Sequence, residues 1–389
     1  MNNKSSVIKE FTYVQRKCCV CGVDNSEDIW QYEHKTRTRS YYWIFEVNNV
    51  VCKKCGFVYV TPVPVTRELE GYYGDSLVTY ENQILDYDID KRLQLINKYK
   101  RNFSTFMELG SNAKSDFSKQ IKSMFNKVIT VEPNHAHESD YENICDVPSN
   151  SINMLTNYFV LEHISNIDEI FNEFKRVVSN NGILICEIPD IRMYPDNITA
   201  CHQHEHLNHF SPPLLARVAE KYGFIEINSS VNECSRNYGF VSVFEKLDVN
   251  DTVSIDKNEY VNNIKYFEDG KNKAISILDE FERARQKLIM LVENNTPYIL
   301  WGANDNLLQF KDALSIDSGL VCVDSDPNKK DYLPGIAIYT PDKANEIINN
   351  SEYIFIFAGR HKNGILNFIQ SNYNKKYDEN RIYILDREK

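Results

Sequence analysis

With 389 residues, of which 42% are hydrophobic and 25% charged, the chain has an ordinary globular composition and is long enough for two or three domains. Its formal net charge of −11 at pH 7 excludes a general nucleic-acid binder, because neutralising phosphates requires a basic surface. The first residues, MNNKSSVIKEF, are too polar for a signal peptide, and no apolar run reaches the ~18 residues of a membrane span. We therefore expect a cytoplasmic protein that has neither a nucleic-acid nor a membrane partner.

The first predicted element is a cysteine-rich segment. Two CxxC pairs, Cys18/Cys21 and Cys52/Cys55, are about 30 residues apart, and a glycine follows each pair directly. Four thiolates at this spacing suit a tetrahedral zinc ion, and the glycines ease the tight turns around it. Such a closed site leaves no position for a substrate, so its predicted role is structural. The alternative is two chance turns with free thiols. Residues 37–52 are expected to form strands.

The next elements resemble half of a nucleoside-binding α/β fold. Residues 88–100 have apolar residues at helical spacing, and a strand, a turn at Gly110 and a second helix are predicted to follow. Another predicted strand ends at Glu132, 22 residues after Gly110. An acid at this distance is typical of a carboxylate that accepts ribose hydroxyls. The loop has a single glycine, which favours S-adenosylmethionine over a dinucleotide that carries a pyrophosphate. An ordinary βαβ unit with a chance glycine and acid is the alternative.

The pattern then continues through the rest of an α/β domain. Residues 152–164 predict a strand that leads into a loop, and residues 166–178 predict an amphipathic helix with Asn166 as its N-cap. A strand over residues 180–190, a helix from Pro212 and a closing strand pair complete the domain.

Four of the nine histidines fall within eight positions, between the predicted strand and the helix from Pro212. They are His202, His204, His206 and His209, and Glu205 lies among them. The run follows a strand by a short connection, which places it at the carboxyl end of the sheet, where ligands of open α/β folds bind. Histidine suits proton transfer near neutral pH. A metal site on one face of a strand and polar loop residues without a role are the two other interpretations.

The last third predicts a second small parallel sheet. A long helix over residues 271–295 is followed by a strand and a turn at Gly302, a strand ending at Asp324, and a further strand with a turn at Gly359.

Five segments together carry a resemblance to a known family. MELGSN, VEPN, NYFVLEHI, NNGILICEIPD and HQHEHLNHFS occur in the order and spacing of the sugar C-methyltransferases, which transfer methyl groups from S-adenosylmethionine to nucleotide-linked keto-deoxysugars. The resemblance implies an α/β protein of three domains. These are an N-terminal zinc ribbon over residues 1–65, a central Rossmann-like class I methyltransferase domain over residues 66–250, and a C-terminal Rossmann-like domain over residues 251–389 that binds the nucleotide-sugar. We expect a monomer or a weak dimer.

The resemblance also implies roles for individual residues. Glu205 and His206 correspond to the acid/base pair, with His204 beside them. The expected cofactor-binding residues are Glu108, Gly110, Ser111, Asn112, Glu132, Pro133, Asn157 and Phe159. The expected substrate-binding residues are Tyr72, Tyr73, Tyr80, Asn304, Asp324 and Lys329. The expected structural Zn²⁺ ligands are Cys18, Cys21, Cys52 and Cys55.

This chain departs from the family pattern at several positions. Ala113 and Lys114 replace an acid and a glycine of the cofactor loop, and CSRNYGF replaces a His-Gly-Gly-Ser segment. The turn at Gly302 lacks the family's lysine and second glycine. Methylation of an oxygen on a nucleotide-linked compound, or binding of a nucleotide-sugar without catalysis, would fit the same scaffold. The single-glycine loop disfavours a nicotinamide oxidoreductase.

Overall fold

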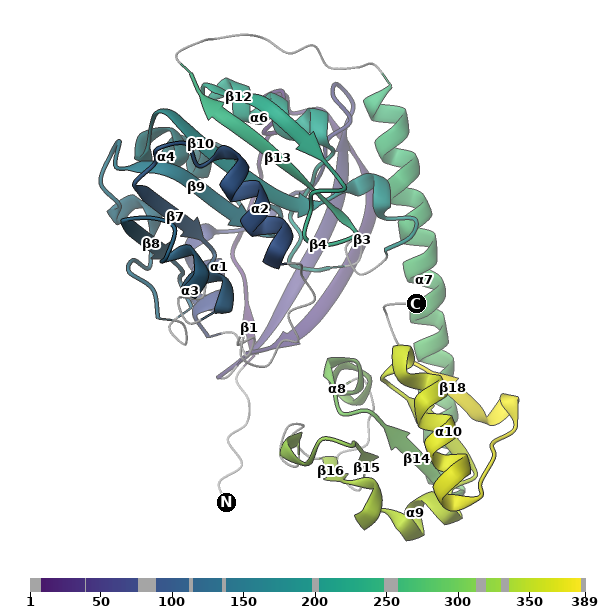
Figure 1. Cartoon of the computed structure of the whole chain (residues 1–389). Coiled ribbons are helices and arrows are strands. Elements are labelled where there is room, and N and C mark those ends of the chain that lie inside the picture. Colours follow the sequence, from purple (N-terminus) through teal and green to yellow (C-terminus); the bar gives the residue numbers. More distant parts are fainter. Residues whose placement is uncertain are drawn as a thin grey trace. The chain divides into compact units, whose positions relative to one another are not determined.

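The computed structural model describes residues 8–38, 40–75, 89–111, 115–134, 138–197, 203–247, 258–312, 320–329 and 336–385. The chain divides into two compact units, Met1–Lys271 and Asn272–Lys389 (Figure 1). The first two of the three predicted domains share the first unit. The boundary between the two units falls at residue 271.

The cysteine-rich segment of the first unit belongs to a five-stranded sheet in the order β1 (Ile8–Glu10), β4 (Tyr42–Cys52), β5 (Val58–Val60) and β11 (Asn208–His209), with β3 (Ser26–Arg37) paired to β4. The strands expected between the two cysteine pairs are therefore confirmed. Alternate residues of β4, namely Trp43, Phe45 and Val47, are buried, as the period of a strand requires. They pack with Leu69 and Tyr72 of α1 (Thr66–Gly74), which fixes α1 against this sheet. A short pair, β2 (Tyr13–Val14) and β6 (Val63–Pro64), lies outside it.

The central sheet has six strands in the order β12, β13, β10, β9, β7, β8. Their bounds are β7 (Thr105–Leu109), β8 (Lys127–Val131), β9 (Ile152–Tyr158), β10 (Val178–Pro189), β12 (Phe224–Ser230) and β13 (Gly239–Lys246). The first four in chain order are parallel, and β12 and β13 form the expected antiparallel closing pair. The α/β prediction for this region is confirmed.

Helices cover both faces of the central sheet (Figure 1). α2 (Ile89–Tyr99) and α3 (Asp116–Ile121) pack with Ile183 and Ile185 of β10, whereas α4 (Ile167–Val177) and α6 (Pro212–Lys221) pack with Leu184 and Cys186. The alternation follows from the two-residue period of a strand buried on both faces. Asn166 caps α4 as expected, because its side chain accepts a hydrogen bond from the Glu169 amide at 3.2 Å.

The face covered by α4 and α6 also contains the cysteine-rich segment. Cys18, Cys52, Cys55, Phe57 and Tyr59 belong to the same hydrophobic cluster as the residues of α4 and α6. This shared core explains why the first two predicted domains form one compact unit.

The second unit has a parallel sheet in the order β16, β15, β14, β17, β18. The bounds are β14 (Tyr298–Trp301), β15 (Leu320–Val323), β16 (Ile336–Tyr339), β17 (Tyr353–Ile356) and β18 (Ile382–Ile384). Strand order reverses between β14 and β17, as in a doubly wound fold. The helices are α8 (Asp305–Asp312), α9 (Asn345–Asn350) and α10 (Lys362–Tyr373). The predicted second parallel sheet is therefore confirmed.

The long helix α7 (Glu259–Glu293) begins 12 residues before the start predicted at residue 271. Phe267 near its start packs with Val58 and Tyr194 of the first unit, and Phe281 and Leu288 pack in the core of the second. One helix therefore contributes to the core of each unit.

Among the residues that the structure describes, no helix combines the length and the apolar composition that crossing a membrane would require.

Candidate functional site

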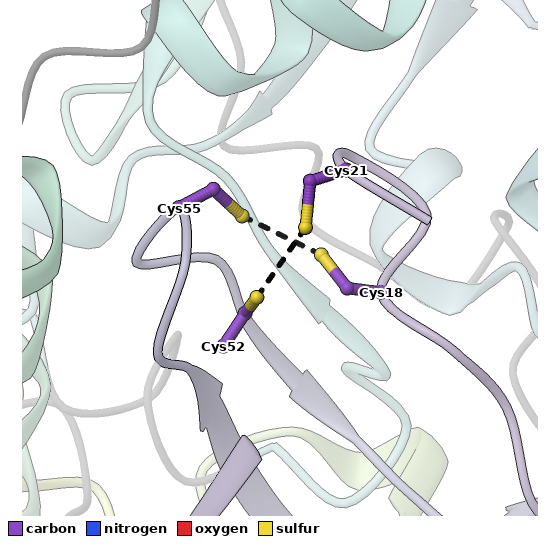
Figure 2. Close-up of side chains that lie close together, drawn as sticks. All are labelled: Cys18, Cys21, Cys52 and Cys55. Carbon is purple, nitrogen blue, oxygen red and sulfur yellow. Dashed lines mark hydrogen bonds between the residues drawn. The ribbon is translucent and has the colours of Figure 1, made fainter. Parts of the chain in front are cut away.

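Figure 2 shows the four cysteine side chains pointing toward one another. The Sγ atoms of Cys18 and Cys55 are 3.5 Å apart, as are those of Cys21 and Cys52, and all four Sγ atoms lie within 4.8 Å of one another. A zinc ion with Zn–S bonds of about 2.3 Å requires tetrahedron edges of about 3.8 Å between sulfurs. The four residues predicted as ligands thus lie together at a spacing that fits zinc. Cys19 is outside this group, and its carbonyl oxygen accepts a hydrogen bond from Lys221.

The glycines after each cysteine pair allow the two turns. Gly22 and Gly56 have φ angles of +70° and +75°, in the left-handed region that favours glycine. Their amides donate to the carbonyl oxygens of Cys18 and Cys52, each at 2.8 Å, which closes the turns around the thiols. A Cβ at Gly56 would lie 2.4 Å from the backbone nitrogen of Tyr260. A side chain at this position would therefore also collide with α7.

The histidine run ends as a strand of the cysteine-rich sheet. In β11, Asn208 pairs with Tyr59 and His209 pairs with Val58 of β5. The Arg16 guanidinium, two residues before Cys18, donates to the Leu207 carbonyl at 2.5 Å and to Asn208 Oδ1 at 2.9 Å. Two elements next to the cysteine pairs therefore hold the histidine run in place: β5, which follows Cys55, and Arg16, two residues before Cys18.

Glu205 has two hydrogen-bond donors. The Tyr72 hydroxyl donates to Oε1 at 2.5 Å and the Gln203 amide donates to Oε2 at 3.1 Å. Burial and the nearby Glu205 charge raise the pKa of Tyr72 well above its ordinary value, so this hydroxyl keeps its proton and acts as a donor. Of the expected substrate tyrosines, Tyr72 thus contacts the expected acid/base group directly.

The described histidines of the run face three different neighbourhoods. His206, whose exposed fraction is 7%, makes an edge contact with the His163 ring at 5.0 Å between centroids. His204 stacks on His34 of β3 at 4.0 Å. Both ring nitrogens of His209 have protein partners, the Tyr194 hydroxyl at 2.6 Å and Asn49 Oδ1 at 2.9 Å.

These contacts argue against a metal site formed by the run itself. His204 and Glu205 lie in a turn rather than on a strand face, and His202 lies outside the described residues. The burial of His209 lowers the pKa of its imidazole to about 3, which keeps the ring neutral in its structural role.

The structure adds Glu162 and His163, to which the sequence interpretation gave no role. Glu162 has an exposed fraction of 1%, and neither of its carboxylate oxygens has a hydrogen-bond partner among the described residues. Burial raises the pKa of Glu162 to about 8. His163 Nδ1 lies 3.3 Å from the Tyr73 hydroxyl. The signal in the sequence was a Glu-His pair that begins four residues after the end of a strand.

The expected cofactor residues lie around the carboxyl ends of β7, β8 and β9. Gly110 follows β7 with a φ angle of +75°, and a Cβ there would lie 2.4 Å from Val160 Cγ2. Glu132 directly follows β8, and its Oε1 accepts from the Asn134 amide across Pro133 at 2.9 Å. Burial raises the pKa values of Glu108 and Glu132 to about 7.

Two further cofactor candidates have buried polar atoms that no described residue satisfies, Ser111 Oγ and Asn157 Oδ1. Phe159 has a φ angle of +58°, a strained value for a bulky residue and one that occurs next to functional sites. Asn112 lies outside the described residues. Three features together fit a nucleoside ligand. They are the unsatisfied polar atoms of Ser111 and Asn157, the acid Glu132 at a strand end, and Gly110, which has no room for a side chain.

Three carboxyl groups act electrostatically on the Tyr73 hydroxyl. Burial raises the pKa of its hydroxyl well above the ordinary value, and the charges of Glu205, Glu162 and Glu132 act in the same direction. The Tyr73 hydroxyl therefore keeps its proton, and it contacts His163 Nδ1 at 3.3 Å.

The substrate candidates of the second unit also lie together. Asp324 follows β15 and accepts from the Ala303 amide at 2.7 Å and from Lys329 Nζ at 3.2 Å. Asn304 Oδ1 accepts from the Leu307 amide at the start of α8 at 3.2 Å. These groups bond within the protein at the carboxyl ends of β14 and β15. Tyr80, the remaining candidate, lies outside the described residues.

Comparison with known proteins identifies the central region. Residues 81–226 match the family model described as a methyltransferase domain. The chain therefore carries a methyltransferase domain, which confirms the prediction of a methyltransferase enzyme at this level. A comparison with curated protein sequences gave no match.

Among solved structures, an S-adenosylmethionine-dependent methyltransferase from Mesorhizobium loti is 9% identical with a TM-score of 0.34, covering 41% of this chain and 100% of the other. Geranyl diphosphate C-methyltransferase from Streptomyces coelicolor A3(2), in complex with Mg²⁺, geranyl-S-thiolodiphosphate and S-adenosyl-L-homocysteine, is 10% identical with a TM-score of 0.34, covering 41% of this chain and 76% of the other. Similarity at this level does not by itself assign a substrate to this chain.

Proposed function

We propose that this chain is an S-adenosylmethionine-dependent methyltransferase that methylates a carbon of a nucleotide-activated keto-deoxysugar. The methyltransferase domain match supports the class of reaction. The resemblance to sugar C-methyltransferases, above all the segment HQHEHLNHFS, supports the substrate class. The observation that carries the proposal is the loop after β9, whose Val160 lies against Gly110 and whose Glu162 carbonyl accepts a hydrogen bond from the Leu207 amide at 2.6 Å. This loop brings the expected cofactor turn close to the expected acid/base group.

For the cofactor, Gly110 would let the backbone approach the nucleoside, and Glu132 would accept its ribose hydroxyls. Ser111 and Asn157 offer buried polar atoms that still need partners. S-adenosylmethionine supplies an electrophilic methyl group on a positively charged sulfur.

Carbon methylation requires removal of a proton next to the ketone. Glu205 and His206 are the groups we assign to this proton, and Tyr72 holds the Glu205 carboxylate in place through its 2.5 Å hydrogen bond. The C–H electron pair moves into an enolate, whose carbon forms the new bond to the methyl group. The methyl–sulfur bond breaks, and its electron pair stays on sulfur as a neutral thioether. Alignment of the two substrates supplies much of the remaining rate enhancement.

We further propose that Cys18, Cys21, Cys52 and Cys55 bind one structural Zn²⁺ ion. Their sulfur–sulfur distances support this, and four thiolates leave no open position for catalysis. The ion would hold together the turns that lead into β5 and hence the strand pairing that positions the histidine run.

The test is a panel of nucleotide-linked keto-deoxysugars incubated with the protein and S-adenosylmethionine, with products followed by mass spectrometry. With a substrate deuterated at the carbon next to the ketone, carbon transfer predicts loss of the deuterium from the methylated product, whereas oxygen transfer predicts that the deuterium is kept. His206→Ala should lower turnover by about 100-fold or more, the usual contribution of an acid/base group, and leave cofactor affinity nearly unchanged.

The exposed His361 provides the matched control, and His361→Ala should turn over normally. Normal turnover of His206→Ala would remove the assignment of His206. Methylated product that keeps the deuterium at that carbon would favour an oxygen methyltransferase, and absence of cofactor binding would favour a non-catalytic binding protein.

A further inference from the structure

Glu162 is a buried carboxyl group whose surroundings in the described structure leave it unsatisfied. Its exposed fraction is 1%, and neither oxygen has a hydrogen-bond partner among the residues with described positions. Glu162 Oε1 lies 3.8 Å from His163 Nε2, and the positive charge of Arg236 also acts on the carboxyl group, without supplying a hydrogen bond to either oxygen. A buried carboxylate without hydrogen bonds is costly unless a positive charge compensates it. A bound cation or a retained proton would therefore stabilise the Glu162 carboxyl group.

The groups around Glu162 are of the kinds that bind metal ions in proteins. One ligand atom each from Glu162, His163 and His206 lies within 4.8 Å of the other two. The three residues come from two segments about 40 positions apart, which a hydrogen bond from the Leu207 amide to the Glu162 carbonyl joins at 2.6 Å. The backbone thereby fixes Glu162 beside the turn that carries His206.

The orientation of His163 also suits a ligand. Its Nδ1 faces the Tyr73 hydroxyl at 3.3 Å, while its Nε2 is the nitrogen near Glu162. In metal sites the second ring nitrogen of a ligating histidine usually bonds to an outer group that fixes the ring. Tyr73 occupies that outer position.

We propose that Glu162, His163 and His206 bind a divalent ion of the manganese-to-zinc series, at a site separate from the four cysteines. Two imidazoles and one carboxylate are ligands that such ions accept. Three protein ligands leave coordination positions open, as in catalytic rather than structural sites. The metal site adds to the proposed function, and the chemical role of the ion rests on that function.

In the metal-loaded protein, the lone pair of His206 would be used in coordination, and proton removal would fall to Glu205, which the Tyr72 hydroxyl holds in place. The ion supplies a Lewis acid for the substrate oxygen that gains negative charge as the neighbouring carbon loses its proton. Loss of turnover in His206→Ala fits both roles of this histidine, so a binding measurement must separate them.

Manganese(II) is the probe, because thiolate ligands select softer ions and leave Mn²⁺ for the site with histidine and carboxylate ligands. The full-length protein, with its cysteine site loaded with zinc, is titrated with Mn²⁺, and the free ion is followed by electron paramagnetic resonance. The wild type should bind one Mn²⁺ per chain. Glu162→Gln, which keeps the shape of the side chain, should weaken binding by more than about tenfold, and Tyr73→Phe should weaken it by about tenfold.

Glu169→Gln on the exposed face of α4 is the matched control and should bind Mn²⁺ as the wild type does. Calorimetry with S-adenosylhomocysteine on the same samples reports the cofactor site independently. If the wild type and Glu162→Gln bind Mn²⁺ equally, or neither binds it, the metal site is overturned even when cofactor binding is normal. Absence of cofactor binding together with Mn²⁺ binding that depends on Glu162 would refute the proposed function and keep the metal site.

Discussion

At the scale of the residue, Glu132 shows that burial disfavours the charged form of a carboxyl group that the predicted ribose contact requires. It directly follows β8 with an exposed fraction of 9%, and burial raises the pKa of its carboxyl group to about 7. One of its oxygens already accepts from the Asn134 amide. A ribose with two hydroxyl donors would give the charged form further partners and so offset its desolvation.

Glu132→Gln should therefore weaken S-adenosylmethionine binding by about tenfold or more, because an amide is a poorer acceptor for two hydroxyls than a carboxylate is. Isothermal titration calorimetry measures the change. Glu142→Gln, at an exposed position ten residues after Glu132, serves as the control and should bind the cofactor normally. Unchanged affinity in Glu132→Gln would remove the ribose role.

Among single residues, the histidines show the limit of sequence reasoning. His204, His206 and His209 look equivalent in the sequence, yet the first stacks on His34, the second meets His163, and the third bonds to Tyr194 and Asn49. Spacing assigns no partner to a histidine in a turn, because its neighbours come from distant segments.

At the scale of the element, β11 connects the cysteine site to the candidate active site. This two-residue strand pairs with β5, which begins three residues after Cys55, and Arg16 bonds to the same segment. If zinc holds the two cysteine turns together, it also holds β5 and Arg16, and through them the residues next to His206.

Cys52→Ser should therefore lower both the stability of the protein and its turnover. Removing one of four zinc ligands weakens the cross-link between the turns, and the freed β5 should position β11 less well. Zinc content by elemental analysis, the melting temperature by calorimetry and turnover are measured on the same sample. Cys145→Ser, at an exposed cysteine outside the four-cysteine group, should change none of the three. Wild-type turnover in a zinc-free Cys52→Ser protein would show that the histidine run does not depend on the cysteine site.

At the scale of the whole molecule, several buried ionisable groups give the stability a predictable pH dependence. Burial raises the pKa values of Glu108 and Glu132 from 4.5 to about 7, and that of metal-free Glu162 from 4.5 to about 8. The folded protein therefore binds more protons than the unfolded chain between these values, so the free energy of unfolding falls as pH rises through them. His209 has the opposite effect on the free energy of unfolding, since burial lowers its pKa from 6.5 to about 3. This effect is confined to pH values below about 6.5.

Between pH 6.5 and 8 these carboxyl groups make the melting temperature fall with rising pH, whereas the thiolates of the proposed zinc site act in the opposite direction because they carry no protons in the folded protein. The carboxyl contribution is therefore measured as the difference in slope between a variant and the wild type. Scanning calorimetry of protein without added cofactor or metal, across a series of buffers, measures this slope. Glu108→Gln should make the slope more positive than in the wild type, because the amide carries no titrating proton, whereas the exposed Glu169→Gln should leave the slope unchanged. A slope in Glu108→Gln equal to that of the wild type would contradict the prediction.

The sequence by itself determined the features that depend on local spacing. The two CxxC pairs with their glycines, the single-glycine turn at Gly110, the acid at the end of the following strand and the second parallel sheet all follow from periods and short intervals that neighbouring residues define. The tertiary structure alone decided the pairing of β11 with β5, the shared core of the cysteine-rich segment and α4, and the meeting of Glu162, His163 and His206. These contacts join segments far apart in the chain, and no hydrophobic period in one segment specifies which distant surface it will cover.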